Sequence, residues 1–156
     1  MTRRSELKEA SPDLGILSSR LLFAVQDELF ENLAVQGHPE LRPRHGAVLA
    51  YLDEEGSRAT ELAHRSGQHK QVVGKLVDEL EALGYVERRP DPTDRRAKLV
   101  VPTARGLDEM TRSDAILASI DARLAATVGA DAYETFKHTF EQLTTDQRAR
   151  SRLRGE

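Results

Sequence analysis

The 156-residue chain contains no cysteine. This absence excludes a disulfide framework, a thiolate nucleophile and any metal site or redox switch built on cysteine. Tryptophan is also absent, and aromatic residues make up only 4% of the chain. We therefore expect a core of Leu, Val and Ala, a composition that favours helices.

No apolar run approaches the roughly 20 residues that span a bilayer, and the polar N-terminus lacks the apolar segment of a signal peptide. The length suits one compact domain, residues 1–156. These features predict a soluble, cytoplasmic protein that has no membrane partner. We expect its polar ends, residues 1–10 and 148–156, to be frayed or solvated.

Motifs that carry chemistry are also missing. The five histidines show no H-x-x-x-H or H-E-x-x-H spacing, and the chain has neither a Gly-rich phosphate loop nor a G-x-S-x-G motif. The acidic run Asp53-Glu54-Glu55 lies in a polar loop and is typical of a solvated turn. We therefore expect no enzymatic activity, no metal and no cofactor.

Residues 68–106 carry the pattern around which the chain is organised. Apolar residues spaced by three and four predict a helix with one buried face, and Gly84 ends it. The apolar residues assigned to that face are Val72, Leu76, Leu80 and Leu83. A strand follows, with Val86 on one side and Tyr85, Glu87 and Arg89 on the other.

The turn Asp91-Pro92-Thr93-Asp94 then leads into a return strand, and Thr103 is the expected N-cap of the next helix. Upstream, Thr60 is expected to cap a short helix that ends at Gly67, which gives a helix-turn-helix pair over residues 60–83. A helix-turn-helix followed by a hairpin with a basic tip is typical of a winged helix.

Acidic residues are absent from Leu62 to Val77, a window that contains Lys70 in the first turn of a helix. The helix dipole disfavours a cation at that end, so an external anion such as a phosphate backbone is indicated. Residues 65–106 carry nine Lys and Arg against six Asp and Glu, whereas the whole chain has a net charge of −3. Charge is therefore segregated, as a nucleic-acid partner requires.

The run LVDELEALGYVERR (residues 76–89), the D-x-R of Asp94 to Arg96 and the T-x-x-G of Thr103 to Gly106 resemble the MarR family of bacterial transcription regulators. The motifs cover residues 41–106, and the helix layout covers the whole chain. The resemblance implies a mainly α fold, a winged helix-turn-helix with long N- and C-terminal dimerisation helices. Residues 41–106 would form the DNA-binding lobe, and residues 11–36 and 104–150 would form the dimerisation helices.

The long helices are also predicted from the residues themselves. Ser11 and Asp13 are expected N-caps of the first, which Gly37 stops. Its wide apolar stripe is compatible with packing inside one chain or with a subunit interface. A shorter helix is expected over residues 41–52, and the last helix begins with a capping box of Asp131 and Glu134.

In a winged helix-turn-helix the second helix enters the major groove, and the wing reaches the backbone or the minor groove. Gln71 suits adenine, and Lys70 or Lys75 suits guanine or phosphate. Gly74 would allow close approach either to DNA or to another helix. The resemblance implies that Arg96 enters the minor groove while Asp94 holds the loop, with Arg95 on phosphate. The DNA-binding candidates are His69, Lys70, Gln71, Gly74, Lys75, Arg88, Asp94, Arg95 and Arg96.

The expected function is a homodimeric transcription regulator, a repressor, that binds a pseudo-palindromic site in double-stranded DNA. The alternative is a winged-helix module for protein–protein interaction without specific DNA binding. The resemblance also implies a small aromatic or amphipathic effector between the terminal helices and the DNA-binding lobe. The nearest candidates for its binding site are Phe23, Phe30, Arg44, His45 and Tyr51.

Overall fold

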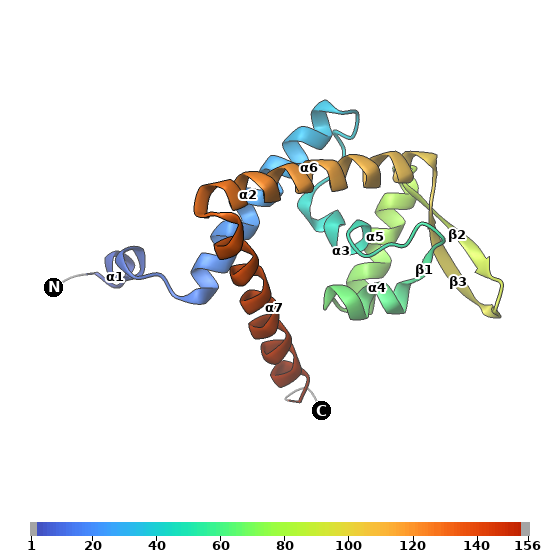
Figure 1. Ribbon diagram of the computed structural model, residues 1–156. Coiled ribbons are helices and arrows are strands. Elements are labelled where there is room, and N and C mark those ends of the chain that lie inside the picture. The colour runs from blue at the N-terminus through green and yellow to red at the C-terminus, as the bar shows by residue number, and fades with distance from the viewer. Residues whose placement is uncertain (1–2, 154–156) are drawn as a thin grey trace. The chain divides into compact units, whose positions relative to one another are not determined.

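A computed structural model describes residues 3–153 of the chain (Figure 1). By their contacts the described residues fall into two compact units that divide between Ile116 and Leu117. The elements of the first unit are α1 (Arg4–Ala10), α2 (Leu14–Val35), the 3-10 helix η1 (Pro43–His45), α3 (Gly46–Leu49), β1 (Ser57–Arg58), α4 (Ala59–Ser66), α5 (Lys70–Ala82), β2 (Val86–Asp91), β3 (Asp94–Pro102) and the start of α6 (Ala104–Val128). The second unit comprises the rest of α6 and α7 (Ala130–Leu153).

The described strands form one antiparallel sheet in the order β1-β3-β2. In the hairpin, Val86 lies opposite Pro102 and Asp91 opposite Asp94, and the short β1 pairs with β3 through Ser57 and Val100. This hairpin extends beyond α5 as a wing (Figure 1). The prediction of a mainly α winged helix-turn-helix is confirmed.

One apolar core joins the helix-turn-helix to the base of the wing. The side chains of Val73, Val77 and Leu80 on α5 are fully buried, and so are those of Tyr85 and Val86. Leu33, Val48 and Leu62 contribute from α2, α3 and α4. The orientation of α5 is therefore set by core packing, and its opposite face is left free.

The T-x-x-G motif at the start of α6 has a steric cause. The Thr103 hydroxyl accepts a hydrogen bond from the Gly106 backbone N–H at 3.2 Å, so Thr103 caps the helix as predicted. A Cβ atom on Gly106 would lie 2.2 Å from the Tyr85 carbonyl oxygen. Only glycine lets α6 begin this close to the wing.

The N-terminal expectations are partly wrong. Residues 4–10 form α1 instead of a frayed end, and α2 begins at Leu14. Asp13 is its N-cap, because its side chain accepts from the Ile16 N–H at 3.0 Å, whereas Ser11 lies outside the helix. At the other end, residues 148–153 continue α7 instead of being ragged. The rest of the two ends, residues 1–2 and 154–156, lies outside the described residues.

Three further boundaries differ from the predictions. The helix expected over residues 41–52 is broken into η1 and the four-residue α3. Pro43 in the first turn is compatible with a helix, but the His45 ring accepts the Arg42 N–H at 3.0 Å and closes a tighter turn. Thr60 does not cap α4, which begins at Ala59, and Asp131 lies in the first turn of α7 rather than at its cap.

The faces of two elements were also misassigned. Val72 is 41% exposed, and Val73 takes its place in the core, because the buried residues Val73, Leu76, Val77 and Leu80 follow a three-one-three spacing. Tyr85 was placed on the outward side with Glu87 and Arg89, but it precedes β2 and is fully buried.

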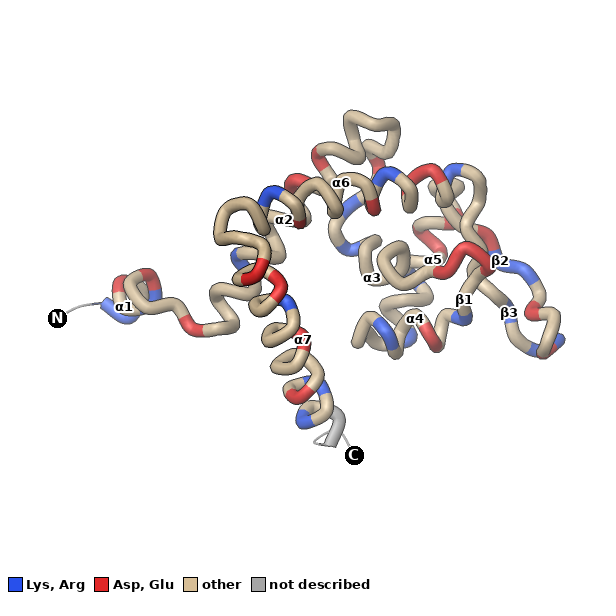
Figure 2. The backbone as a smooth tube through the Cα atoms, viewed as in Figure 1, with Lys and Arg blue, Asp and Glu red and all other residues tan. Residues whose placement is uncertain are grey.

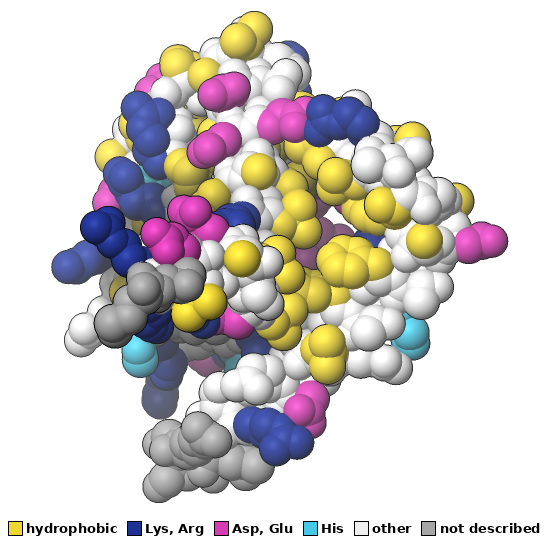
Figure 3. All heavy atoms as spheres, turned by 90° about the vertical axis from the view of Figure 1, so that its left-hand side faces the viewer, with side chains coloured by type: hydrophobic (Ala, Val, Ile, Leu, Met, Phe, Trp, Pro, Cys, Tyr) yellow, Lys and Arg dark blue, Asp and Glu magenta, His cyan; other side chains and the backbone are white. Residues whose placement is uncertain are grey.

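Large apolar side chains on α2 remain exposed in the single chain. Leu14, Leu17 and Leu21 share a face at spacings of three and four, and each is at least 40% exposed. Figure 3 displays a face of the molecule on which many hydrophobic side chains gather. Within residues 3–153, none of the helices combines the length and apolar character that crossing a bilayer requires.

Candidate nucleic-acid interface

The turn between α4 and α5 presents the start of α5 to solvent. Gly67 closes α4 with a left-handed φ of 72°, which residues with a Cβ rarely adopt. The Gln68 N–H then donates to the Ala63 carbonyl at 3.2 Å. This sharp reversal lets α5 leave the turn with its first residues exposed.

The first turns of α5 carry exposed polar side chains that have no partner among the described residues. His69 is the N-cap but makes no side-chain capping bond, and the first turn contains no acid. Lys70, Gln71 and Lys75 are exposed, and neither lysine has an ion-pair partner among the described residues. A helix N-terminus with uncapped N–H groups and free cations is suited to binding phosphate.

Gly74 lies on the same part of α5. A Cβ atom built on it would have nothing within 4 Å, so no other helix of the described chain requires a glycine here. Among the described residues, Gly74 therefore does not serve close packing against another helix of the same chain. Glycine costs about 1 kcal/mol relative to alanine in a helix, and the open space beside Gly74 is compatible with close approach by another molecule.

The tip of the wing is held by Arg58 of β1. Its Nε donates to Asp91 at 2.8 Å, and a second guanidinium nitrogen lies 3.9 Å from Asp94. The Asp91 carboxylate also accepts from the Thr93 hydroxyl and N–H, at 2.7 and 2.8 Å. These hydrogen bonds, first those from Thr93 and then that from Arg58, lower the pKa of Asp91 to about 2.

Asp94 fixes the backbone that carries the wing arginines, because its Oδ1 accepts from the Arg96 N–H at 3.0 Å. Arg95 and Arg96 themselves are exposed, and neither side chain has an ion-pair partner among the described residues. Figure 2 shows basic residues along this hairpin. The wing thus has a braced backbone and two free guanidinium groups.

Arg88 differs from the other basic candidates because its charge is already neutralised within the chain. Its guanidinium donates to Asp78 at 2.6 Å and to Glu81 at 2.5 Å, and its backbone N–H donates to Glu81 at 3.2 Å. Both acids lie on α5, so Arg88 clamps the root of the wing to that helix. Nothing in the sequence spacing pointed to this pairing.

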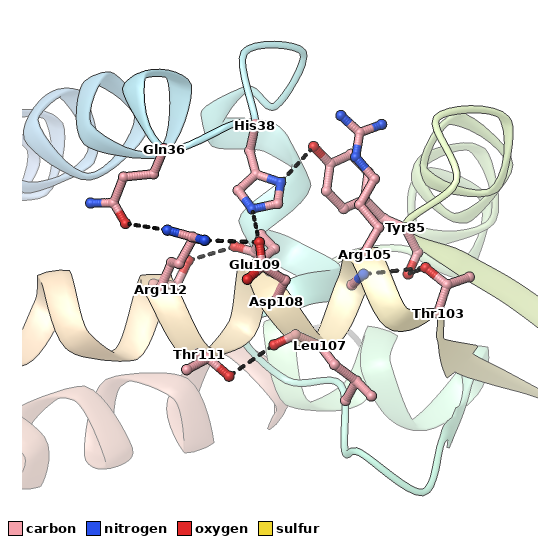
Figure 4. A network of polar contacts seen from close by, with 12 residues as sticks. Gln36, His38, Tyr85, Thr103, Arg105, Leu107, Asp108, Glu109, Thr111 and Arg112 are labelled. Carbon is pink, nitrogen blue, oxygen red and sulfur yellow. Dashed lines mark hydrogen bonds and ion pairs between the residues drawn. The ribbon is translucent and has the colours of Figure 1, made fainter.

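A polar network joins the segment that follows α2, Tyr85 just beyond the end of α5 and the start of α6 (Figure 4). The buried His38 ring lies between the Tyr85 hydroxyl, 3.0 Å from Nδ1, and Asp108, 3.1 Å from Nε2. Arg105 donates to Glu40 at 2.9 Å and covers the Tyr85 ring at 4.4 Å. Burial raises the pKa of Tyr85 to about 12.

The same network includes one incompletely bonded acid. The Ser113 hydroxyl donates to Oε1 of the buried Glu109 at 2.5 Å, whereas Oε2 has no hydrogen-bond partner among the described residues. Burial raises the pKa of this carboxyl group. Sequence reasoning missed the whole network, since its members are single polar residues scattered over residues 36–113.

The effector candidates are only partly brought together. Arg44 Nε and His45 Nε2 both contact Glu79, at 2.9 and 3.0 Å. Because His45 Nδ1 accepts the Arg42 N–H, Nε2 carries the ring proton and donates to Glu79. Burial is the main cause that lowers the pKa of His45, so the neutral ring is favoured.

A surface pocket of about 370 Å³ adjoins Arg44 and His45, but it includes none of the predicted aromatic residues. Its lining residues are Glu40, Arg42, Arg44, His45, Glu79, Ala82 and Leu83. Phe23 and Tyr51 are exposed, and Phe30 is half-buried on α2. Within the described part of the chain, no group of His, Asp or Glu side chains is arranged to hold a metal ion.

Comparison with known proteins gives consistent matches. The model of the MarR family matches residues 40–97. Transcriptional repressor MprA of Escherichia coli (strain K12) is 30% identical over 107 residues, which cover 66% of this chain and 61% of MprA. The chain spans less than two thirds of the length of MprA and of other curated relatives that it matches.

Solved structures extend the likeness over most of the chain. CouR from Rhodococcus jostii RHA1 bound to p-coumaroyl-CoA is 29% identical and has a TM-score of 0.70, over 85% of this chain and 92% of that one. The transcriptional repressor CouR bound to a 23-mer DNA duplex is 25% identical with a TM-score of 0.71, over 92% and 99% of the two chains. These relatives are regulators rather than enzymes, as predicted. The chain therefore belongs to the MarR family of winged helix-turn-helix transcriptional regulators.

Proposed function

We propose that the protein is a homodimeric repressor that binds a pseudo-palindromic DNA operator, with one α5 helix in the major groove of each half-site. The observation that carries this proposal is a set of unpaired cations on α5 and the wing. Lys70, Lys75, Arg95 and Arg96 lack ion-pair partners among the described residues, and all lie on α5 or the wing. The neighbouring Arg58, Arg65 and Arg88 are instead paired within the chain.

The residues that carry binding follow from this distribution. The start of α5, with His69, Lys70, Gln71, Gly74 and Lys75, contacts base edges and phosphates. Arg96 enters the minor groove, whose narrow form concentrates negative potential, and Arg95 contacts phosphate. Asp94 and Arg88 hold the wing in position, and residues 41–106 form the binding lobe.

Dimerisation is supported by the exposed apolar stripe of α2. Leu14, Leu17 and Leu21 would cost free energy if left in water, and a second copy of the chain would cover them. Residues 11–36 and 104–150 form the interface, and a two-fold axis suits half-sites one helical turn apart. Leu17→Glu is expected to give monomers in light scattering, whereas Glu54→Gln, in an exposed loop, leaves the dimer intact.

Release from DNA is assigned to a small-molecule effector. CouR, a structural relative, is known bound to p-coumaroyl-CoA and bound to DNA, which supports the same pair of states here. Phe23, Phe30, Arg44, His45 and Tyr51 are the proposed contacts, and the pocket beside Arg44 supports part of that set. Differential affinity of the effector for the free and DNA-bound states would shift the equilibrium.

The test is selection of bound duplexes from a random-sequence pool at about 150 mM salt, followed by sequencing. An enriched inverted repeat with half-sites about ten base pairs apart is expected. The Arg95→Ala/Arg96→Ala variant should lose most of the enrichment, and Arg4→Ala, which removes an exposed cation of α1, should keep it. Absence of any enriched sequence would instead favour a winged-helix protein–protein interaction module.

A further inference from the structure

Val72 is an apolar side chain on the outward face of the helix proposed to read DNA. It is 41% exposed, although Val73 and Val77 of the same helix are fully buried. It precedes Lys75 by three residues, so these two side chains are neighbours on the helix surface, and it follows Gln71, whose side chain points about 100° around the helix. A single exposed valine is ordinary on a protein surface, and its position among these side chains is what requires an explanation.

The neighbours of Val72 determine what it can meet. The free ammonium groups of Lys70 and Lys75 flank this stretch of α5. Gly74 has open space above its Cα, which permits close approach by an outside molecule. Gln71 and Val72 are the second and third residues of the helix, and the N-terminal residues of a recognition helix are those that contact base edges.

The chemistry of valine selects among the base edges in the major groove. Its two methyl groups neither donate nor accept hydrogen bonds, so a donor or acceptor on a base would lose its water against them without compensation. Thymine is the base that offers an apolar group there, its 5-methyl. Contact between valine and this methyl group removes apolar surface from water on both sides.

We propose that Val72 is a specificity-determining residue that contacts the 5-methyl group of a thymine in each half-site of the operator. The inference rests on the proposed DNA-binding function and adds a residue and a base to it. Gln71, the preceding residue of α5, would then read adenine.

The test uses the duplex obtained from the selection and replaces each thymine in turn by deoxyuridine, which lacks only the 5-methyl group. At one symmetric position per half-site, loss of the thymine 5-methyl group should weaken wild-type binding about fourfold per methyl group. Val72→Ala should bind the thymine and uracil duplexes equally well at that position. Replacements at other thymines should affect the wild type and the variant alike.

Each outcome decides between possibilities. If the wild-type protein selects no duplex, the proposed DNA-binding function is itself wrong, and this inference falls with it. A selected duplex in which every uracil replacement has the same effect on wild type and Val72→Ala overturns the thymine contact. Equal weakening of thymine and uracil duplexes by Val72→Ala also overturns it, since Val72 would then contact sugar or backbone. Alanine favours helix, so Val72→Ala should fold, and circular dichroism checks this.

Discussion

Arg88 on strand β2 donates to Asp78 on α5 at 2.6 Å, which ties the root of the wing to the helix proposed to enter the major groove. Glu81 adds a second carboxylate at 2.5 Å. These two ion pairs neutralise the charge of Arg88, which would otherwise be available to bind a phosphate. In the proposed complex the wing and α5 engage DNA together, so the angle between them matters as much as their charges.

Removing both acids tests the clamp. Asp78→Asn/Glu81→Gln makes the lobe more positive, so non-specific binding should strengthen. If the clamp sets the angle of the wing, the ratio of specific to non-specific affinity should fall by about three- to tenfold, measured by titration with operator and scrambled duplexes. An unchanged or higher ratio would mean that Arg88 fixes nothing that DNA recognition needs.

Replacement of Arg95 and replacement of Arg96 should change DNA binding in different ways. Arg96→Ala is expected to weaken operator binding about tenfold or more, because it loses a groove contact. Arg95→Ala should lower the slope of log affinity against log salt by about one unit, since one phosphate contact is lost. Arg4→Ala is the matched control for the loss of one positive charge. Unchanged affinity in both wing variants would remove the wing from the mechanism.

Asp91 should make the stability of the wing sensitive to strong acid. Its pKa in the fold is about 2, below the ordinary value of 3.8, so its contribution is present above pH 4 and is lost as the pH falls toward 2. Asp91→Asn should therefore melt at a lower temperature than wild type at pH 6, and the difference should shrink by pH 2.5. Melting curves that stay equally far apart at both pH values would contradict this.

The buried carboxyl group of Glu109 should lower the free energy of unfolding at neutral pH. Burial raises its pKa, so the stability that its neutral form contributes is present below the ordinary pKa of 4.5 and is lost as the pH rises through the higher value. Glu109→Gln should stabilise the protein at pH 8 by about 1–2 kcal/mol, and the gain should vanish at pH 4. Denaturant unfolding measures this, with the exposed Glu54→Gln as control. Destabilisation at pH 8 would show that the charged form has a partner.

Tyr85 should be needed for its hydroxyl as well as for its ring. Tyr85→Phe keeps the apolar packing but leaves His38 Nδ1, buried 3.0 Å from the hydroxyl, without a partner. The expected cost is about 1–3 kcal/mol in the free energy of unfolding. The same change at the more exposed Tyr51 should cost little. Equal, small effects at both positions would mean that water replaces the lost hydroxyl.

Several secondary-structure elements of this protein are determined by local sequence alone. The helix-turn-helix, the hairpin and the Thr103 cap depend on residues within a few positions of each other, whereas the need for glycine at 106 comes from the Tyr85 carbonyl. Local rules of turn chemistry and helix ends therefore find them. The free cations of α5 and the wing were likewise visible as an acid-free window and an arginine-rich turn.

Side-chain contacts between residues far apart in the chain were determined only by the tertiary structure. Arg88 reaches Asp78, His38 reaches Tyr85 and Asp108, and Arg58 reaches Asp91, at separations that no periodicity marks. Val72 and Val73 are adjacent valines with the same helical preference. Which one is buried depends on how α5 rotates against the core, and that rotation is fixed by the packing of the helix as a whole.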